Sequence, residues 1–181
     1  MIGDEQMRKV YIVLTYTGTI LSKLVKLYTH KEFSHVSISL DEKLDEMYSF
    51  GRLNPYNPFW GGFVHENKNK GTFKRFYKTK TRIYSIQVNE DQYESLKQLI
   101  KDIQDENKRK SYKFNMIGLI AVMFNLRIKR ERGFYCAEFV KYCLEESNIE
   151  LNLPDIIKPD DFNKILDVSE VYKGQLRDYD V

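Results

Sequence analysis

Hydrophobic and polar positions alternate in parts of this chain with the period of a strand and recur in other parts with the period of a helix. An apolar, β-branched run at 10–17 predicts a strand, and the apolar positions of "TILSKLVKLYTH" at 19–30 follow helical spacing. Two short alternating segments between 34 and 52, separated by a polar turn at 41–43, predict a β-hairpin. The chain is therefore expected to open with a strand, a helix and a hairpin.

Helices dominate the pattern in the second half of the chain. Tyr93, Leu96, Ile100 and Ile103 form one apolar stripe, which predicts a helix over 91–108. The other expected elements are a Pro- and Gly-rich loop at 54–62, a strand at 81–88, an apolar helix at 116–124 and a helix that begins at Cys136. Pro154 and Pro159 then interrupt the chain before a last strand at 169–176. This order predicts an α+β fold, with a small antiparallel sheet packed against a helical group, in a single domain over 1–181.

Composition and charge narrow the class of protein. With 181 residues and 42% hydrophobic content, the chain can bury a sizeable core and is not typical of a disordered protein. The net charge of +3 is too small to indicate a nucleic-acid binder, although basic residues cluster at 68–82 and 127–132. Alternation in the first cluster predicts a β-hairpin with one solvated face, and binding to an anionic substrate or a membrane surface is the alternative.

No segment has the pattern of an export signal or of a membrane span. Acidic residues precede the first basic residue at the amino terminus, and Tyr and Thr interrupt the apolar run that follows. No secretory signal is therefore predicted, and a cytoplasmic location is expected. The most apolar segment, 116–124, has about half the length that crosses a bilayer, so it is expected to be a buried helix.

Both cysteines fall on one predicted helix, in "RGFYCAEFVKYCLEE". A separation of seven residues on a helix places their Cα atoms about 10 Å apart, which is too far for a disulfide. Further ligands at metal-binding spacing are missing from the neighbouring sequence, so no metal and no cofactor is expected. Cys143 shares a face with apolar residues and is expected in the core. Cys136 falls in the first turn, where free N–H groups and the helix dipole stabilise a thiolate.

A nucleophilic cysteine needs a base, and the sequence offers three histidines. His30 ends the predicted first helix, where a cation beside the last carbonyls is favourable, and His65 falls in a loop-like, solvent-facing segment. His35 lies on a predicted strand and shares its face with Ser37 and Ser39. A polar strand face can border a cleft, so His35 is the candidate base.

Two motifs in the chain resemble those of a known family. "FSHVSISLD" holds a strand histidine, and "FYCAEFV" holds a helix-start cysteine that follows an aromatic residue and precedes a small residue, an acid and a hydrophobic pair; "YKFNMIGLI" resembles the helix that commonly precedes the cysteine. With histidine before cysteine, the stretch from Val10 to Leu144 resembles the permuted papain-like, NlpC-type cysteine amidohydrolases, in their YaeF/YiiX-like branch, and the related lecithin retinol acyltransferases. The resemblance implies a permuted papain-like fold, Cys136 as nucleophile, His35 as base, and a third polar group on a neighbouring strand that orients the imidazole.

Three residues are candidates for the third polar group. If the hairpin pairs Leu40 with Leu44, Ser49 stands across from His35. A shift of one residue would substitute Tyr48, because register decides which side chains face each other. Glu46 lies farther along the same strand and is the carboxylate alternative. We select Ser49, which can accept a hydrogen bond from the imidazole but supplies no charge.

The expected chemistry is attack of Cys136 on an amide or ester carbonyl, with hydrolysis or acyl transfer as the outcome. The N–H of Cys136 would donate to the oxyanion, whereas Glu138 is interpreted as a first-turn charge favoured by the helix dipole. The expected substrate is a small peptide-like or acyl-lipid molecule, with anionic examples preferred because of the two basic clusters. A non-catalytic module that binds a small ligand or lipid is the alternative, with nucleic-acid binding a more distant one.

Overall fold

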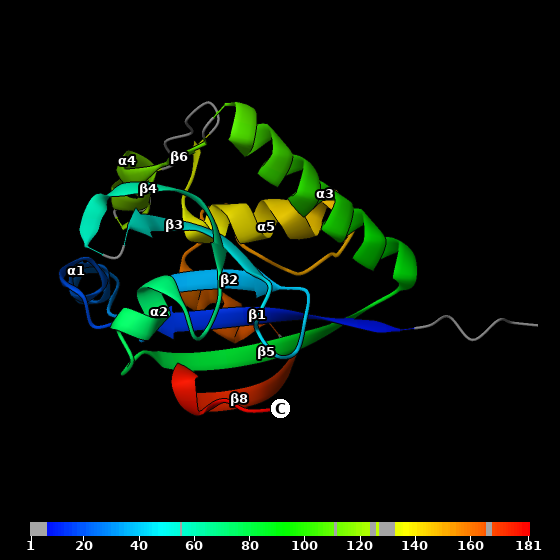
Figure 1. The fold of residues 1–181 in the computed structure, drawn as a ribbon, viewed down its shortest axis with the longest axis horizontal. Coiled ribbons are helices and arrows are strands. Elements are labelled where there is room, and N and C mark those ends of the chain that lie inside the picture. Colours follow the sequence, from blue (N-terminus) through cyan, green and yellow to red (C-terminus); the bar gives the residue numbers. More distant parts are fainter. Residues whose placement is uncertain (1–6, 55, 111, 124–125, 127–132, 166–167) are drawn as a thin grey trace, which may run out of the picture.

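One antiparallel sheet organises the part of the chain that the computed structural model describes, residues 7–54, 56–110, 112–123, 126, 133–165 and 168–181. Within these residues the sheet has six strands, and its helices gather on one side and at one end (Figure 1). The strands lie in the order β4 (Asn57–Glu66), β3 (Met47–Asn54), β2 (His35–Ser39), β1 (Arg8–Tyr16), β5 (Lys80–Val88) and β8 (Ser169–Gln175). The predicted α+β class is confirmed.

The central position of β1 explains its continuous apolar run. Its neighbours on the two sides are β2 and β5, both antiparallel to it. Val10, Ile12 and Leu14 point into the larger core, beneath the helices. Tyr11 and Val13 point into a second core on the opposite face of the sheet. Because both faces are covered, apolar residues are favoured at nearly every position of the strand.

The helical layer on the first face consists of α3 (Glu90–Arg109) and α5 (Cys136–Glu146) (Figure 1). α5 packs against β2 and β3, and α3 packs against α5 and β1. A capping box starts α3: Asn89 Oδ1 accepts from the Gln92 N–H at 2.8 Å, and the Asn89 N–H donates to Gln92 Oε1 at 3.0 Å. The predicted stripe of α3 is buried, which confirms the periodicity argument; its residues are Tyr93, Leu96, Ile100 and Ile103.

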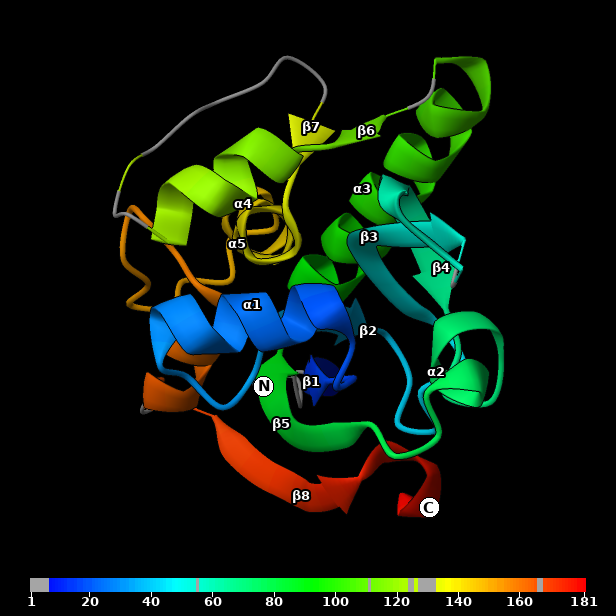
Figure 2. The same cartoon turned by 90° about the vertical axis from the view of Figure 1, so that its left-hand side faces the viewer.

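Two further helices, α1 (Ile20–Thr29) and α4 (Met116–Met123), lie beside each other near the beginning of α5 (Figure 2). None of the helices within the described ranges is both long and apolar enough to cross a membrane. The short elements are α2 (Gly71–Arg75), the 3-10 helices η1 (Pro159–Lys164) and η2 (Leu176–Asp178), and a parallel pair formed by β6 (Lys113–Phe114) and β7 (Gly133–Phe134).

Two expected elements differ from those observed. The segment at 54–62 is not a loop, because most of it belongs to β4, which pairs with β3. Its Pro58 is tolerated there since β4 is the edge strand of the sheet. The basic segment at 68–82 is not a hairpin: it forms α2 and the beginning of β5. The second basic cluster, 127–132, lies outside the described residues.

Candidate active site

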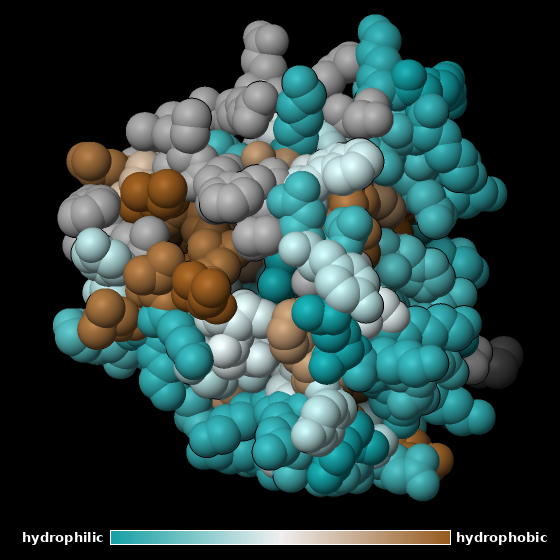
Figure 3. Space-filling model, turned by 60° about the vertical axis from the view of Figure 1, so that its left-hand side comes forward, coloured by the Kyte–Doolittle hydropathy of each residue, from teal (hydrophilic) through white to brown (hydrophobic). Residues whose placement is uncertain are grey.

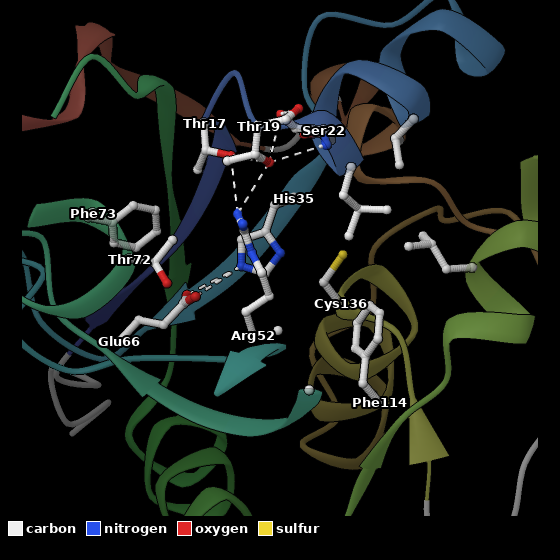
Figure 4. Close-up of a pocket in the computed structure, with 16 residues that line it drawn as sticks. Thr17, Thr19, Ser22, His35, Arg52, Glu66, Thr72, Phe73, Phe114 and Cys136 are labelled. Carbon is white, nitrogen blue, oxygen red and sulfur yellow. Dashed lines mark hydrogen bonds and ion pairs between the residues drawn. The ribbon is translucent and has the colours of Figure 1, made fainter. Parts of the chain in front are cut away.

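A small cavity of about 60 Å³ lies where the first residues of β2 and of α5 meet. Its walls also include the turn before α1 and the middle of the β3–β4 hairpin (Figure 4). His35 and Cys136 both line it, although 101 positions separate them in the sequence. The sheet and α5 therefore bring the two candidate residues together.

Cys136 is the first residue of α5, directly after the N-cap residue Tyr135. Two hydrogen bonds fix this end of the helix: Phe139 N–H donates to the Tyr135 carbonyl at 3.0 Å, and the Tyr135 hydroxyl donates to the Ile157 carbonyl at 3.1 Å. Cys136 is only 2% exposed, and its sulfur points into the cavity on the side of His35 (Figure 4). The sulfur therefore lies at the positive end of the α5 dipole.

His35 is the first residue of β2 and pairs with Thr15 of β1. Its Nε2 lies 3.2 Å from Oε1 and 3.4 Å from Oε2 of Glu66, while the other ring nitrogen points toward Cys136 (Figure 4). Burial alone would lower the pKa of His35. The Glu66 carboxylate, together with hydrogen bonding and charge interaction with Cys136, more than offsets burial and raises the pKa to about 10. The imidazolium form is therefore favoured at neutral pH.

Glu66, the last residue of β4, is the carboxylate that faces His35. Ser37 donates a hydrogen bond of 2.5 Å from its hydroxyl to Glu66 Oε2. Burial would raise the pKa of Glu66, but the charge of His35 and the hydrogen bonds to the carboxylate lower it overall. Glu66 is thus an ionised partner for the imidazolium.

The predicted hairpin register is wrong by two residues. β2 and β3 pair Ile38 with Tyr48 and Ser39 with Met47, and continuing this register places Gly51, not Ser49, across from His35. The turn is wide because the Asp41 carboxylate accepts hydrogen bonds from the backbone N–H groups at positions 45 and 46. Leu44, which the prediction paired with Leu40, has a positive φ of 59° and is buried in the second core instead.

The three residues expected as orienting groups therefore stand elsewhere. The buried Ser49 hydroxyl forms no well-aligned hydrogen bond with any described residue, yet it lies close enough to Glu66 to help lower the pKa of that carboxyl. Tyr48 lies in the larger core and stacks on His65, with ring centroids 4.8 Å apart. Glu46 is exposed in the turn. None of the three contacts His35 through a hydrogen bond within the described part of the chain.

Gly51 makes the contact between His35 and Glu66 geometrically feasible. A Cβ at this position would lie 3.3 Å from His35 Cε1 and 3.6 Å from Glu66 Oε1. Since β3 runs between β2 and β4, a larger residue here would push into the space that the ring and the carboxylate share. Sequence reasoning missed Glu66 because it read this stretch as a loop: the Pro and Gly residues of β4 and its lack of alternation leave no strand signal there.

The remaining cysteine and histidines have separate locations. Cys143 is fully buried in the larger core, as predicted, and burial raises the pKa of its thiol. His30 is the C-cap of α1, with a left-handed conformation (φ 53°), and donates its N–H to the Lys26 carbonyl at 2.9 Å. His65 is solvent-facing as expected, but it lies on β4 and not in a loop.

A second cavity, of about 300 Å³, adjoins the first. Arg52 and Glu66 line both cavities, together with Thr72 and Phe73. Within the described ranges, no group of three or more His, Cys, Asp or Glu side chains is arranged to hold a metal ion. The two cavities share part of their walls, and Arg52 and Glu66 belong to the shared part, which we call the cleft.

No protein-family model matches the sequence of this chain, and no curated protein is significantly similar to it.

Proposed function

We propose that this protein is a thiol-dependent hydrolase or acyltransferase with a permuted papain-like fold, in which Cys136 attacks an amide or ester carbonyl. One observation carries the proposal: Cys136 and His35 share a small cavity, and the largely buried carboxylate of Glu66 holds the far side of the imidazole. A nucleophile, a base and a group that orients the base are the parts that such chemistry requires. The order of strand histidine before helix-start cysteine supports the same family.

In the first step, the Cys136 sulfur attacks the carbonyl carbon and the carbonyl π electrons move onto oxygen. Backbone N–H groups in the first turn of α5 lack intrahelical acceptors, so they are the donors for this oxyanion. When the tetrahedral intermediate collapses, the carbon–nitrogen or carbon–oxygen bond breaks and the His35 imidazolium gives its proton to the leaving group. The products of this step are an acyl thioester on Cys136 and a free amine or alcohol.

In the second step, neutral His35 accepts a proton from water or from an acceptor hydroxyl or amine. The deprotonated acceptor attacks the thioester, and the carbon–sulfur bond breaks with the electron pair returning to sulfur. The Cys136 thiolate and the His35 imidazolium are regenerated. Water as the acceptor gives hydrolysis, and any other acceptor gives acyl transfer.

Glu66 acts in this scheme as a positioning residue. Its hydrogen bond to Nε2 orients the ring so that the other nitrogen faces sulfur, and its charge stabilises the imidazolium. The Ser37 hydroxyl in turn fixes the carboxylate. The charged Glu66 both orients the ring and stabilises the imidazolium, whereas a neutral Ser49 could only orient the ring.

The cavity lining suits a small apolar group beside the scissile carbonyl. Leu21 and Val25 of α1, Leu119 of α4 and Phe114 form an apolar wall around the sulfur. An acyl chain or a small apolar side chain fits this composition, and the larger cavity can hold the remainder of the molecule. The substrate class is therefore a small peptide-like or acyl-lipid amide or ester.

The test is a panel of fluorogenic amides, esters and thioesters, assayed with the wild type, with Cys136→Ala and with Cys143→Ala as the matched control. Turnover that Cys136→Ala abolishes and Cys143→Ala retains is the expected result. Turnover that persists in Cys136→Ala contradicts the mechanism. Ligand binding without turnover, altered by changes at Cys136, would instead favour the non-catalytic binding module.

A further inference from the structure

Arg52 lines both cavities and has no carboxylate partner of its own among the described residues. Arg52 lies on β3, one residue after Gly51, and is half-buried. Its Nη2 donates to the hydroxyls of Thr17 at 3.4 Å and Thr19 at 3.3 Å, and Figure 4 shows its side chain reaching toward these residues. No described acidic residue forms an ion pair with Arg52. Both hydrogen bonds are long, and both acceptors are neutral.

Glu66 does not replace such a partner. It is near enough to oppose the effect of burial, which lowers the pKa of Arg52, but its oxygens already interact with His35 and Ser37. A guanidinium has five N–H donors, and the hydrogen bonds to Thr17 and Thr19 use only its Nη2 atom. Arg52 therefore keeps donors and positive charge for a ligand in the cleft. The Phe76 ring, 5.3 Å from the guanidinium carbon, supports its position from one side.

The positive charge of Arg52 persists through the proposed reaction. When the thioester forms, the sulfur loses its negative charge and His35 loses its positive charge, because its proton leaves with the amine or alcohol. Arg52 is then the cation that remains in the cleft, and it can attract an anionic group on the acyl part of the substrate.

We propose that Arg52, with Thr17 and Thr19, forms a subsite for a carboxylate or phosphate group of the substrate, next to the carbonyl that Cys136 attacks. This inference rests on the proposed function for its substrate role, but the anion site itself depends only on the cavity and its charges. The fork of the guanidinium matches either anion in bidentate geometry. Thr19 also caps α1, so the positive end of that helix adds to the local potential.

The anion could belong to a soluble molecule or to a lipid headgroup. Exposed apolar side chains gather beside the cleft, over α1 and α4 (Figure 3); those of large size are Ile20, Leu24, Leu27, Tyr28, Ile120 and Leu126. Three of the five aliphatic residues in the predicted α1 stripe thus face outward: Ile20 is 81% exposed, Leu27 is 65% exposed and Leu24 is also exposed. Leu21 is half-buried and Val25 is buried. This surface could contact acyl chains, so the experiment needs a lipid arm.

The decisive experiment compares two alkylating reagents of nearly equal size, the anion iodoacetate and the neutral iodoacetamide. The ratio of their rates at Cys136 is measured by mass spectrometry in the wild type, Arg52→Gln, Arg52→Lys and Arg177→Gln. Arg177 is a matched arginine on η2, paired with Asp178 outside the cleft. We expect Arg52→Gln to lower the iodoacetate preference roughly tenfold or more, as loss of a charge-assisted hydrogen bond predicts. Arg52→Lys should give an intermediate ratio, and Arg177→Gln should leave it unchanged.

This readout needs only a reactive thiol, so it separates the anion subsite from the enzymatic proposal. An unchanged ratio in both Arg52 variants, or an equal fall in Arg177→Gln, would overturn the subsite. If Arg52→Gln does not fold, as judged by circular dichroism, Arg52→Lys decides the question because it keeps the charge but loses the planar fork. Absence of turnover with every substrate would contradict the proposed enzymatic activity but not the anion subsite.

Two further arms identify the source of the anion. The first compares competition by acetate and inorganic phosphate for alkylation of Cys136. The second measures sedimentation with phosphatidylglycerol and with phosphatidylcholine vesicles for the wild type and Arg52→Gln. Protection by the small anions alone assigns the subsite to a soluble substrate. Arg52-dependent binding to phosphatidylglycerol vesicles assigns it to a lipid headgroup. If the wild type shows neither protection nor vesicle binding, the subsite is contradicted.

Discussion

His35 Nε2 lies 3.2 Å from Glu66 Oε1, although β3 separates the two strands that carry these residues. β3 runs between the strands that carry them, and Gly51 on β3 leaves the space in which they meet. The pair gives the imidazole a charged anchor on the side opposite Cys136. Replacing Glu66 should therefore affect thiol chemistry while the nucleophile Cys136 and the base His35 remain in place.

Glu66→Gln should slow turnover on the order of 100-fold, because the variant keeps the shape of the side chain but loses the charge that orients and stabilises the imidazolium. Alkylation of Cys136 by iodoacetamide near neutral pH should slow as well. Glu46→Gln is the matched control, since Glu46 is exposed in the turn. An equal loss in the control, or full activity of Glu66→Gln, would contradict the role of Glu66. Ser49→Ala should have a smaller effect than Glu66→Gln.

The same pair should make stability depend on pH in a defined window. His35 has its pKa raised from 6.5 to about 10 on folding, so its contribution is fully present below pH 6.5 and is lost as pH rises through about 10. Glu66 has its pKa lowered from 4.5, so its contribution is present above pH 4.5 and is lost as pH falls below that value. The pair thus stabilises the fold most between these limits.

Urea unfolding of the wild type and Glu66→Gln measures this effect. The variant should lose on the order of 1–3 kcal/mol at about pH 6, because the mostly buried imidazolium of His35 is left without its counter-charge. The difference between the two proteins should shrink at about pH 9, where the stabilisation from protonated His35 is smaller. A difference that stays constant across this range would show that His35 and Glu66 are not coupled.

The two cysteines should differ in reactivity toward iodoacetamide. Cys143 is fully buried and its pKa is raised by burial, so its thiol should stay unmodified in the folded protein. Cys136 should be labelled selectively near neutral pH, and His35→Ala should slow that labelling. Peptide mass spectrometry separates the two sites. Equal labelling of both cysteines, or indifference to His35→Ala, would identify Cys136 as a structural residue.

The two glycines that line the cavity should respond differently to alanine. A Cβ at Gly61 would lie 2.7 Å from Phe114 Cβ and 2.8 Å from the Gly51 carbonyl oxygen, and the backbone cannot yield easily. Gly61→Ala should therefore destabilise the protein by about 1–3 kcal/mol. A Cβ at Gly51 would meet His35 Cε1 at 3.3 Å, so Gly51→Ala should mainly displace the ring and reduce activity several-fold. Thermal unfolding and turnover, measured together, separate the two effects.

Local patterns were sufficient for the elements whose neighbours in sequence decide their structure. The apolar stripe of α3 predicted its buried face, because helical periodicity is a property of a single segment. The apolar run at 10–17 predicted β1, and the position of Cys136 predicted the beginning of α5. His35 and Cys136 could be selected as candidates for the same reason, since their strand and helix contexts are local.

The carboxylate partner of His35 depended on tertiary structure. Its identity is set by the register of β2, β3 and β4, and that register follows from a wide turn in which Asp41 binds two backbone N–H groups and Leu44 enters the second core. Leu44 is buried by residues that are distant in sequence, so the sequence near the turn does not predict its burial. A two-residue shift then exchanged Ser49 for Gly51 opposite His35.

The sequence by itself thus determined the α+β class, the main helices and strands, and the two residues proposed for thiol chemistry, because hydrophobic periodicity and helix-start geometry are encoded over a few residues. Only the tertiary structure decided that Glu66 faces His35, that Arg52 lines two cavities, and that three of the five residues of the α1 stripe are exposed. Each of these depends on which strands and helices become neighbours. Such long-range contacts are selected by the packing of the whole chain and leave no periodic signal of their own.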